Sequence, residues 1–295
     1  MRESPMSLRL DLAFLIGYTE SEKTGGSPAG NEETNMEPLV KSELRGCVRL
    51  LTLNDPASFN AMDPNLSAAL LSAVEEAEAD PATRVVVITG AGKAFCAGGN
   101  LKAVLASEGG ISPTLCGMVE VLNRMTLILR RSGKIFIAAV NGVAAGAGMS
   151  LAMACDLRIV SERAKFRQAY SSSGLTPDAG WTVFATELLG PHKAMELVLR
   201  DPLLSAAEAL ELGLANEVCP AEQLEERTMA IAEEIAAKPA FALGLAKAQI
   251  NRAQLDTLEQ RLRQELDMMA QASSHADAAE GIRAFAEKRT PVFNR

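Results

Sequence analysis

The chain has 295 residues, 48% of them apolar, and a formal net charge of −8. A chain of this length and composition can bury one large core, with or without a smaller appendage. The acidic balance excludes a diffuse nucleic-acid-binding surface, although it leaves room for a local basic patch that binds an anionic ligand.

The cysteine and histidine patterns argue against disulfides and metal binding. The five cysteines contain no Cys-x-x-Cys pair, and the two histidines complete no zinc spacing. We therefore predict free thiols, a reducing cytoplasmic location and no metal site. Cys96 and Cys155 lie in apolar runs, where we expect them to pack as small hydrophobic side chains.

The first 35 residues are predicted to form a disordered extension outside the fold. Their longest apolar run, residues 12–18, is too short for a bilayer span, which needs about 20 residues. Residues 21–36 are rich in Gly, Ser, Glu and Asn, a composition typical of disorder. Met36 is therefore a candidate natural start.

Strand and helix patterns alternate through the first part of the remaining chain. Asp63-Pro64 supplies an N-cap and a first-turn proline, and Pro81 stops the helix that they open. The runs of β-branched residues are continuous rather than alternating, which predicts strands that are buried on both faces. Strands are expected at residues 48–53, 85–89, 135–140 and 157–160, and helices at 64–79, 115–129 and 150–155. This alternation predicts an α/β architecture with parallel pairing.

The pattern becomes helical from Ser205, where Ser205-x-x-Glu208 has the form of a capping box. Further helices are expected at residues 221–238, 241–253, 255–272 and 277–288. We divide the chain into a core, residues 36–237, and a C-terminal helical region, residues 238–295.

Two glycine loops follow buried strands. The first, residues 90–100, lacks the spacing of a phosphate-binding P-loop, because Ala94 follows Lys93, and Phe95 breaks the dinucleotide fingerprint. Residues 96–99 and 145–148 instead expose backbone N–H groups with little side chain in the way. Two such groups from separate loops can form an oxyanion hole. The small residues can equally serve only to let backbone pack on backbone, and spacing alone does not separate the two readings.

The resemblance to a known family rests on five stretches, which are residues 54–62, 92–101, 141–148, 155–158 and 280–289. In these stretches the chain resembles the crotonase superfamily, also called the enoyl-CoA hydratase/isomerase family. The resemblance implies a spiral core of ββα turns and a C-terminal helical region that builds homotrimers and often hexamers. It also implies a coenzyme A thioester as the substrate, with no separate cofactor.

The same resemblance assigns residues to the site. The oxyanion-hole amides of the family fall on Gly99 and Ala147. The coenzyme A contacts of the family fall on Ala57, Ser58, Phe59, Lys102, Phe285 and Lys288. Lys102 and Lys288 would otherwise be ordinary exposed lysines.

The chain departs from the family's hydratases at the two glutamates that handle water. Those positions hold Ser150 and Tyr170, neither of which is a carboxylate base at neutral pH. Asp178, within residues 174–181, resembles the carboxylate of the isomerase branch, which includes the ring-opening isomerase of aerobic phenylacetate degradation and Δ3,Δ2-enoyl-CoA isomerases. The alternative is a turn residue or an N-cap for the helix that starts near Trp181.

One carboxylate beside an oxyanion hole predicts an acyl-CoA isomerase. Asp178 would move a proton from the γ to the α carbon while the amides of Gly99 and Ala147 hold the enolate oxygen. The acyl pocket is predicted to contain Met149, Ser150, Phe166, Tyr170 and Trp181. Rival readings are hydratase-like chemistry, dehalogenation with Asp178 as nucleophile, C–C cleavage and, more remotely, a non-catalytic or RNA-binding relative. We expect no nucleic-acid or membrane partner.

Overall fold

The computed structural model describes residues 37–294. The predicted extension, residues 1–35, and its apolar run at 12–18 lie outside these residues. Within the part of the chain that is described, no helix is long and apolar enough to cross a membrane.

A six-stranded sheet forms the centre of the molecule, in the order β1-β2-β3-β5-β7-β10. β1 and β2 are antiparallel, and every later pair in this sheet is parallel. The strands are β1 (Val40–Arg45), β2 (Val48–Leu53), β3 (Val85–Gly90), β5 (Ile135–Val140), β7 (Leu157–Ser161) and β10 (Glu217–Cys219). The four predicted strands are therefore confirmed, and the sheet also contains β1 and β10, which the sequence did not predict.

Both faces of the central strands of this sheet are buried, which explains the continuous apolar runs. Along β3, Val86 and Ile88 belong to the main core, whereas Val85 and Val87 belong to a second cluster on the other face. That second cluster is completed by apolar side chains of α8 (Leu224–Ala236). In a strand that is buried on one face only, apolar residues alternate with polar ones. Here helices cover both faces, so successive residues are apolar.

A smaller sheet continues the main strands, in the order β4-β6-β8-β9. Its strands are β4 (Ala94–Cys96), β6 (Val143–Ala145), β8 (Lys165–Arg167) and β9 (Leu204–Ser205). Each of β3, β5 and β7 is followed by one of these short strands before the next helix begins, so the repeating unit is strand, strand, helix. The predicted ββα spiral is confirmed.

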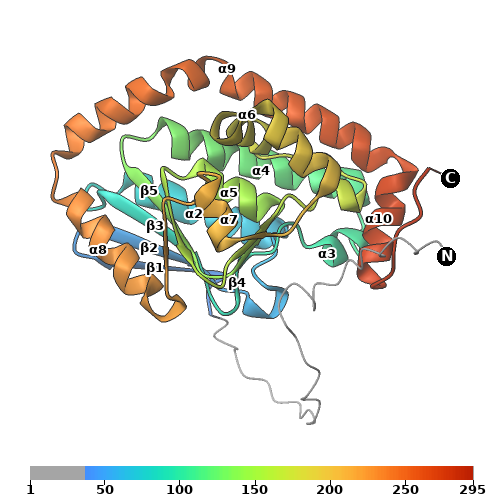
Figure 1. Ribbon diagram of the computed structural model, residues 1–295, viewed down its shortest axis with the longest axis horizontal. Coiled ribbons are helices and arrows are strands. Elements are labelled where there is room, and N and C mark those ends of the chain that lie inside the picture. The colour runs from blue at the N-terminus through green and yellow to red at the C-terminus, as the bar shows by residue number, and fades with distance from the viewer. Residues whose placement is uncertain (1–36, 295) are drawn as a thin grey trace, which may run out of the picture.

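The remaining helices enclose the two sheets (Figure 1). They are α2 (Pro64–Ala79), α3 (Leu101–Leu105), α4 (Ile111–Arg131), α5 (Ala147–Ala154), α6 (Trp181–Arg200), α7 (Ala206–Glu211), α9 (Ala240–Ser274) and α10 (Ala276–Ala286), with short 3-10 turns η1 (Pro56–Ser58), η2 (Ser171–Ser173) and η3 (Ala221–Gln223). The predicted caps are present: Asp63 accepts a hydrogen bond from the N–H of Leu66, and Ser205 and Glu208 form a capping box.

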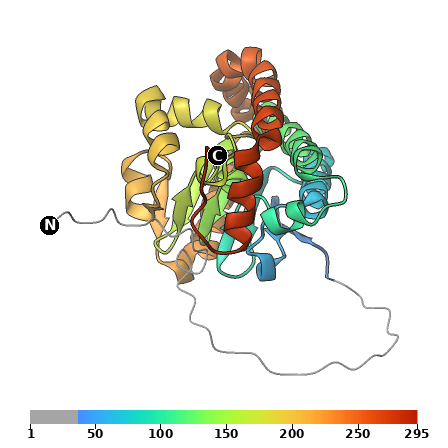
Figure 2. The ribbon, with the colours of Figure 1, turned by 90° about the vertical axis from the view of Figure 1, so that its right-hand side faces the viewer.

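The prediction of two helices at 241–253 and 255–272 is wrong, because α9 is one helix of 35 residues. Figure 1 shows α9 running over α4 and α6 before the chain turns into α10. The buried side chains in its first half, Lys247 and Asn251, are polar. The ammonium of Lys247 is buried and donates to the carbonyl oxygens of Leu129 and Lys134 and to Asp156, at 2.7–2.8 Å. Figure 2 looks onto α10, which contacts α3 and η2.

Candidate active site

One cavity contains the residues that the sequence assigns to the chemistry. Gly99 and Ala147 line it together with Tyr170 and Asp178. Gly99 follows β4, Ala147 opens α5, and Asp178 lies between η2 and α6, so three separate segments meet here. Most of the other lining side chains are apolar and include Leu101, Leu115, Met118, Val119, Leu122, Leu175, Met269 and Phe285.

The N–H groups of Gly99 and Ala147 have no acceptor among residues 37–294. Met62 forms a parallel bridge with Gly99, in which Met62 donates to the carbonyl of Gly98 and Asn100 donates to the carbonyl of Met62. This pairing uses the groups on either side of Gly99 and leaves its own N–H unused. Ala147 is the first residue of α5, where a helix has no internal partner for an N–H group. Two free donors that line one cavity are suited to binding an oxyanion.

The glycines of the two loops differ in the space around them. A Cβ on Gly148 would lie 2.1 Å from the carbonyl oxygen of Cys96, so Gly148 permits backbone to pack on backbone. A Cβ on Gly99 would meet nothing closer than Leu101, at 3.9 Å. Gly148 is therefore required for packing, whereas packing does not account for the glycine at position 99.

Asp178 is buried and hydrogen-bonded to the side chain of Tyr170. The hydroxyl of Tyr170 donates to Oδ1 of Asp178 at 2.8 Å. Loss of hydration raises the pKa of Asp178 to about 7, while the hydrogen bond from Tyr170 opposes that rise and the negative charge of Glu265 adds to it. A carboxyl group that titrates near neutrality can both take up and release a proton at physiological pH.

Ser150 completes a hydroxyl network behind Asp178. Its Oγ lies 3.0 Å from the hydroxyl of Tyr170 and donates to the backbone carbonyl of Asp178, also at 3.0 Å. Burial raises the pKa of Tyr170 well above its usual value, so its proton stays on the phenol. Ser150 and Tyr170 thus act as neutral hydrogen-bonding groups.

The turn that carries Asp178 is held from behind by a residue that the sequence did not single out. Glu265 of α9 is buried and accepts hydrogen bonds from the N–H of Gly180 at 2.7 Å and of Thr182 at 2.9 Å. Ala179 and Gly180 have φ values of 54° and 91°. The sequence carries one signal for Glu265, which is its spacing. It lies on the same buried stripe of α9 as the apolar residues Leu258, Leu262 and Met269.

A second cavity holds most of the residues that the resemblance assigned to coenzyme A. It is lined by Ala57, Ser58, Phe59, Lys102 and Phe285. Gly99 and Phe285 line both this cavity and the one with Asp178, so the two cavities adjoin. Lys288 does not line it and lies two residues beyond the end of α10.

The wall of the cavity that contains Asp178, named the acyl cavity after the predicted acyl pocket, differs from the prediction. Tyr170 lines it, but Met149, Ser150, Phe166 and Trp181 do not. All four are buried outside this cavity, Met149 and Ser150 on α5, Phe166 on β8 and Trp181 at the start of α6. In such short, fully buried segments, periodicity does not indicate which side chains face a cavity. The wall comes instead from α4, α9 and α10, through the residues named above.

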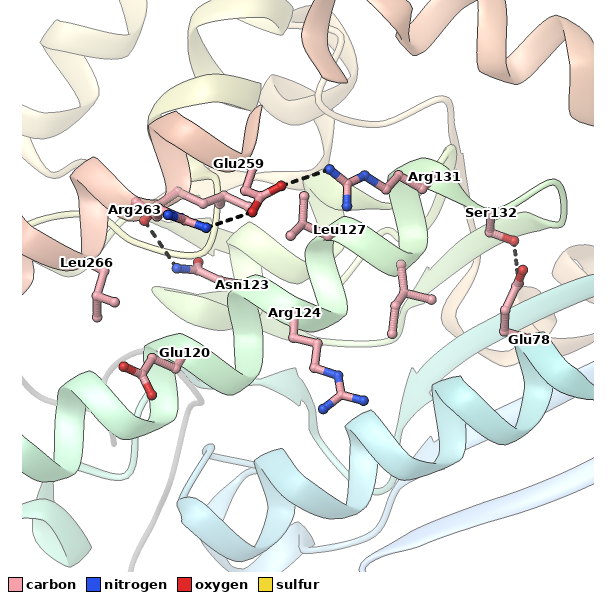
Figure 3. Close-up of a pocket in the computed structure, with 12 residues that line it drawn as sticks. Glu78, Glu120, Asn123, Arg124, Leu127, Arg131, Ser132, Glu259, Arg263 and Leu266 are labelled. Atoms are coloured by element: carbon pink, nitrogen blue, oxygen red, sulfur yellow. Dashed lines mark hydrogen bonds and ion pairs between the residues drawn. The ribbon is translucent and has the colours of Figure 1, made fainter. Parts of the chain in front are cut away.

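A third cavity lies between α2, α4 and α9 (Figure 3). Arg131 and Arg263 line it and both pair with Glu259, at 3.1 Å and 2.9 Å. It shares no residue with the two cavities above. Within residues 37–294, no group of three or more His, Cys, Asp or Glu side chains is placed to hold a metal ion.

The chain was compared with known proteins. The sequence model of the family described as enoyl-CoA hydratase/isomerase matches residues 43–295. A 1,2-epoxyphenylacetyl-CoA isomerase from Escherichia coli (strain K12) is 38% identical over 88% of this chain and 99% of the relative. A probable mitochondrial enoyl-CoA hydratase from Dictyostelium discoideum is 36% identical over 86% of this chain and 90% of the relative. A solved enoyl-CoA hydratase from Mycobacterium avium subsp. paratuberculosis K-10 superposes with a TM-score of 0.79 at 32% identity, covering 87% of this chain and 99% of that one.

Proposed function

The chain belongs to the enoyl-CoA hydratase/isomerase family, also called the crotonase superfamily, and on that premise we propose that it is an acyl-CoA isomerase with a single acid/base carboxylate. One observation carries the proposal. Among the described residues that line the acyl cavity, Asp178 is the only carboxylate, and it shares that cavity with the free N–H groups of Gly99 and Ala147. The two positions at which the resemblance places the hydratase glutamates hold the hydroxyls of Ser150 and Tyr170.

The proposed reaction moves one proton. The carboxylate of Asp178 removes a proton from the α carbon of a β,γ-unsaturated acyl thioester, between the carbonyl and the double bond, and the C–H electrons flow into a dienolate. The γ-to-α direction expected from the sequence is wrong, because the γ carbon of this substrate is part of the double bond. The N–H groups of Gly99 and Ala147 donate to the resulting thioester oxyanion, and each such donor contributes about 3 kcal/mol of transition-state stabilisation in other enzymes. Asp178 then returns the proton to the γ carbon, which leaves the double bond between the α and β carbons, conjugated with the carbonyl.

The surroundings of Asp178 suit this cycle. Its pKa of about 7 makes the carboxyl group a competent base and, once protonated, a competent acid. The apolar wall from α4 keeps the cavity poor in water, which strengthens the oxyanion contacts and disfavours hydration of the product.

We further propose that coenzyme A occupies the outer cavity. The backbone of residues 57–59 and the side chain of Lys102 would contact the nucleotide part, and Phe285 would lie where the thioester enters the acyl cavity. Lys288 remains a proposed contact from beyond α10. A homotrimer or a hexamer and a cytoplasmic location are proposed from the family resemblance.

A ring isomerisation is a second candidate substrate reaction. The relative with 38% identity is named for a 1,2-epoxide of phenylacetyl-CoA, which favours a test of that substrate class. The same oxyanion donors and the same carboxyl group would assist the expansion of an epoxide ring to an oxepin. The two reactions differ in the acyl group and use the same residues.

The test is incubation with a 3-enoyl-CoA while conjugated-enoyl absorbance is followed. We expect absorbance to rise with the wild type and to rise at least about 100-fold more slowly with Asp178→Asn, which cannot accept the proton. A 2-enoyl-CoA added to the wild type should keep its absorbance, because no second carboxylate activates water. Full isomerisation by Asp178→Asn would overturn the proposal, and so would rapid loss of the 2-enoyl absorbance. Incorporation of ¹⁸O from labelled water into the carboxylate of Asp178 would indicate that Asp178 acts as a nucleophile instead.

A further inference from the structure

The carboxylate of Glu265 lies on the buried face of α9 and outside the acyl cavity. Its neighbours on that face, Leu258, Leu262 and Met269, are apolar and buried, as the inward side of a helix normally is. A carboxylate on such a face is costly unless it is hydrogen-bonded, so its partners indicate what it does there.

All three hydrogen bonds to Glu265 come from the first residues of α6. Oε2 accepts from the N–H of Gly180, and Oε1 accepts from both the N–H and the hydroxyl of Thr182. These N–H groups belong to the first turn of α6, where the positive end of the helix dipole favours a negative charge. Glu265 therefore caps α6 from another helix.

The capped turn begins at Asp178. The N–H of Trp181 donates to the carbonyl of Asp178 at 3.0 Å, and the carbonyl of Ala179 accepts from the hydroxyl of Thr126 on α4. Ala179 has a positive φ of 54°, a conformation that a non-glycine residue holds only when its surroundings impose it. The contact with Glu265 is the only one in this set that comes from the C-terminal helices.

We infer that Glu265 is a positioning residue for the proposed isomerisation: by binding the N–H groups of Gly180 and Thr182, it fixes the turn that aims the Asp178 carboxylate into the acyl cavity. This inference rests on the proposed function of Asp178. It makes α9 part of the catalytic machinery as well as part of the helical layer.

The charged groups around this contact define how it can be tested. Tyr170 lowers the pKa of Asp178 and the negative charge of Glu265 raises it, and Arg261 lies one turn before Glu265 on α9. Arg167 also lines the acyl cavity, but its guanidinium pairs with Asp201 at 2.8 Å. Removing the negative charge of Glu265 should thus move the pKa of Asp178 to a lower value, while removing the whole side chain should also release the turn.

The experiment compares Glu265→Gln, Glu265→Ala and the control Glu259→Gln, which changes an exposed carboxylate six residues earlier on α9. With Glu265→Gln, the acid limb of the kcat–pH profile should shift to lower pH. With Glu265→Ala, kcat should fall about 100-fold with little change in KM, because displacing a reacting group by about 1 Å has that effect. The control should match the wild type in both respects.

Two readouts separate this inference from the proposed function. Trp181 is the only tryptophan of the chain and lies between Gly180 and Thr182, so its fluorescence reports the start of α6 without any substrate. The carboxyl ¹³C resonance of Asp178, assigned by its absence in Asp178→Asn, reports titration directly. Unchanged Trp181 emission and an unchanged Asp178 titration in both Glu265 variants would overturn the inference, even if the wild type isomerises 3-enoyl-CoA. Failure of the wild type to isomerise 3-enoyl-CoA would overturn the proposed function alone. The Trp181 emission and the Asp178 titration would still test, without substrate, whether Glu265 positions Asp178.

Discussion

The two sides of the acyl cavity are held in place by different means. The side with Gly99 and Ala147 is assembled from backbone, since its loops approach so closely that a Cβ on Gly148 would overlap a carbonyl oxygen. The side with Asp178 is assembled from side chains, through hydrogen bonds from Tyr170 and Ser150. Backbone contacts cannot be altered without moving strands, whereas side-chain contacts can be removed one at a time. We therefore expect substitutions where backbone packs on backbone, as at Gly148, to affect folding, and those among the side chains around Asp178 to affect protonation.

The largest expected effect is that of Gly148→Ala, which should destabilise the protein by on the order of 5 kcal/mol or prevent folding. The new Cβ would lie 2.1 Å from the carbonyl oxygen of Cys96, and backbone cannot rotate away. Without this overlap, alanine would stabilise a helix by up to about 1 kcal/mol relative to glycine. Denaturant unfolding measures the difference. The matched control is Gly99→Ala, whose Cβ has room and which should leave stability within about 1 kcal/mol. Equal losses in both variants would remove the distinction between the two glycines.

The second prediction concerns stability and pH. The folded-state pKa of Asp178 is raised from 3.8 to about 7, so between these values the folded protein binds a proton that the unfolded chain has released. Stability must therefore fall as pH rises from about 4 to about 7, by up to about 4 kcal/mol from this group. Asp178→Asn removes that loss, because an amide does not titrate and can still accept from Tyr170. It should be more stable than the wild type at pH 8 and no more stable at pH 4.

The control for this prediction is Asp80→Asn. The hydrogen bond from Thr83 is the main cause that lowers the pKa of Asp80 to about 2, so its charged form stabilises the folded state above pH 4. The variant should lose stability at pH 8 relative to the wild type, opposite in sign to Asp178→Asn. Denaturant unfolding at both pH values measures the two differences. If both variants change stability in the same direction at pH 8, Asp178 does not titrate near neutrality.

The third prediction is that Tyr170→Phe shifts the acid limb of the kcat–pH profile to higher pH. The phenol donates to Asp178 and lowers the pKa of that carboxyl group, so its removal allows burial to raise the pKa further. A hydrogen bond to a charged group contributes about 1.5–3 kcal/mol, which corresponds to a shift of about one to two pH units. Turnover should fall about tenfold at pH 7 and recover by about pH 9. A loss that is the same at every pH would show that Tyr170 contributes through shape alone.

The strands that could be read from the sequence are those with continuous burial. β2, β3, β5 and β7 appear at the predicted positions because both faces of the sheet are covered. β1 was missed, since only its first residue is buried and charged residues follow. The strands of the smaller sheet have two or three residues, too few for any periodicity to show.

The residues proposed for the chemistry could be named from the sequence, whereas most of the wall around them could not. Gly99, Ala147 and Asp178 were named from the glycine loops and the family resemblance, and they line one cavity. The acyl wall was not predictable, because Met149 and Trp181 are as apolar as the side chains that do line it. Glu265 was missed for another reason, since its partners are backbone N–H groups 83 and 85 residues away, which a sequence does not display.

The smallest expected effect is that of Ser150→Ala, which removes a hydroxyl from the same network as Tyr170. After the change the carbonyl of Asp178 still accepts from the N–H of Trp181, and the phenol of Tyr170 still donates to Asp178. No buried group loses its last partner, so the cost should be about 1 kcal/mol of stability and no more than about a threefold loss of kcat at pH 7. Unfolding in denaturant and the kcat–pH profile measure both. An acid limb that moves as far as in Tyr170→Phe would mean that the two hydroxyls act on Asp178 as one unit, since Ser150 would then be needed to hold the Tyr170 hydroxyl on Oδ1.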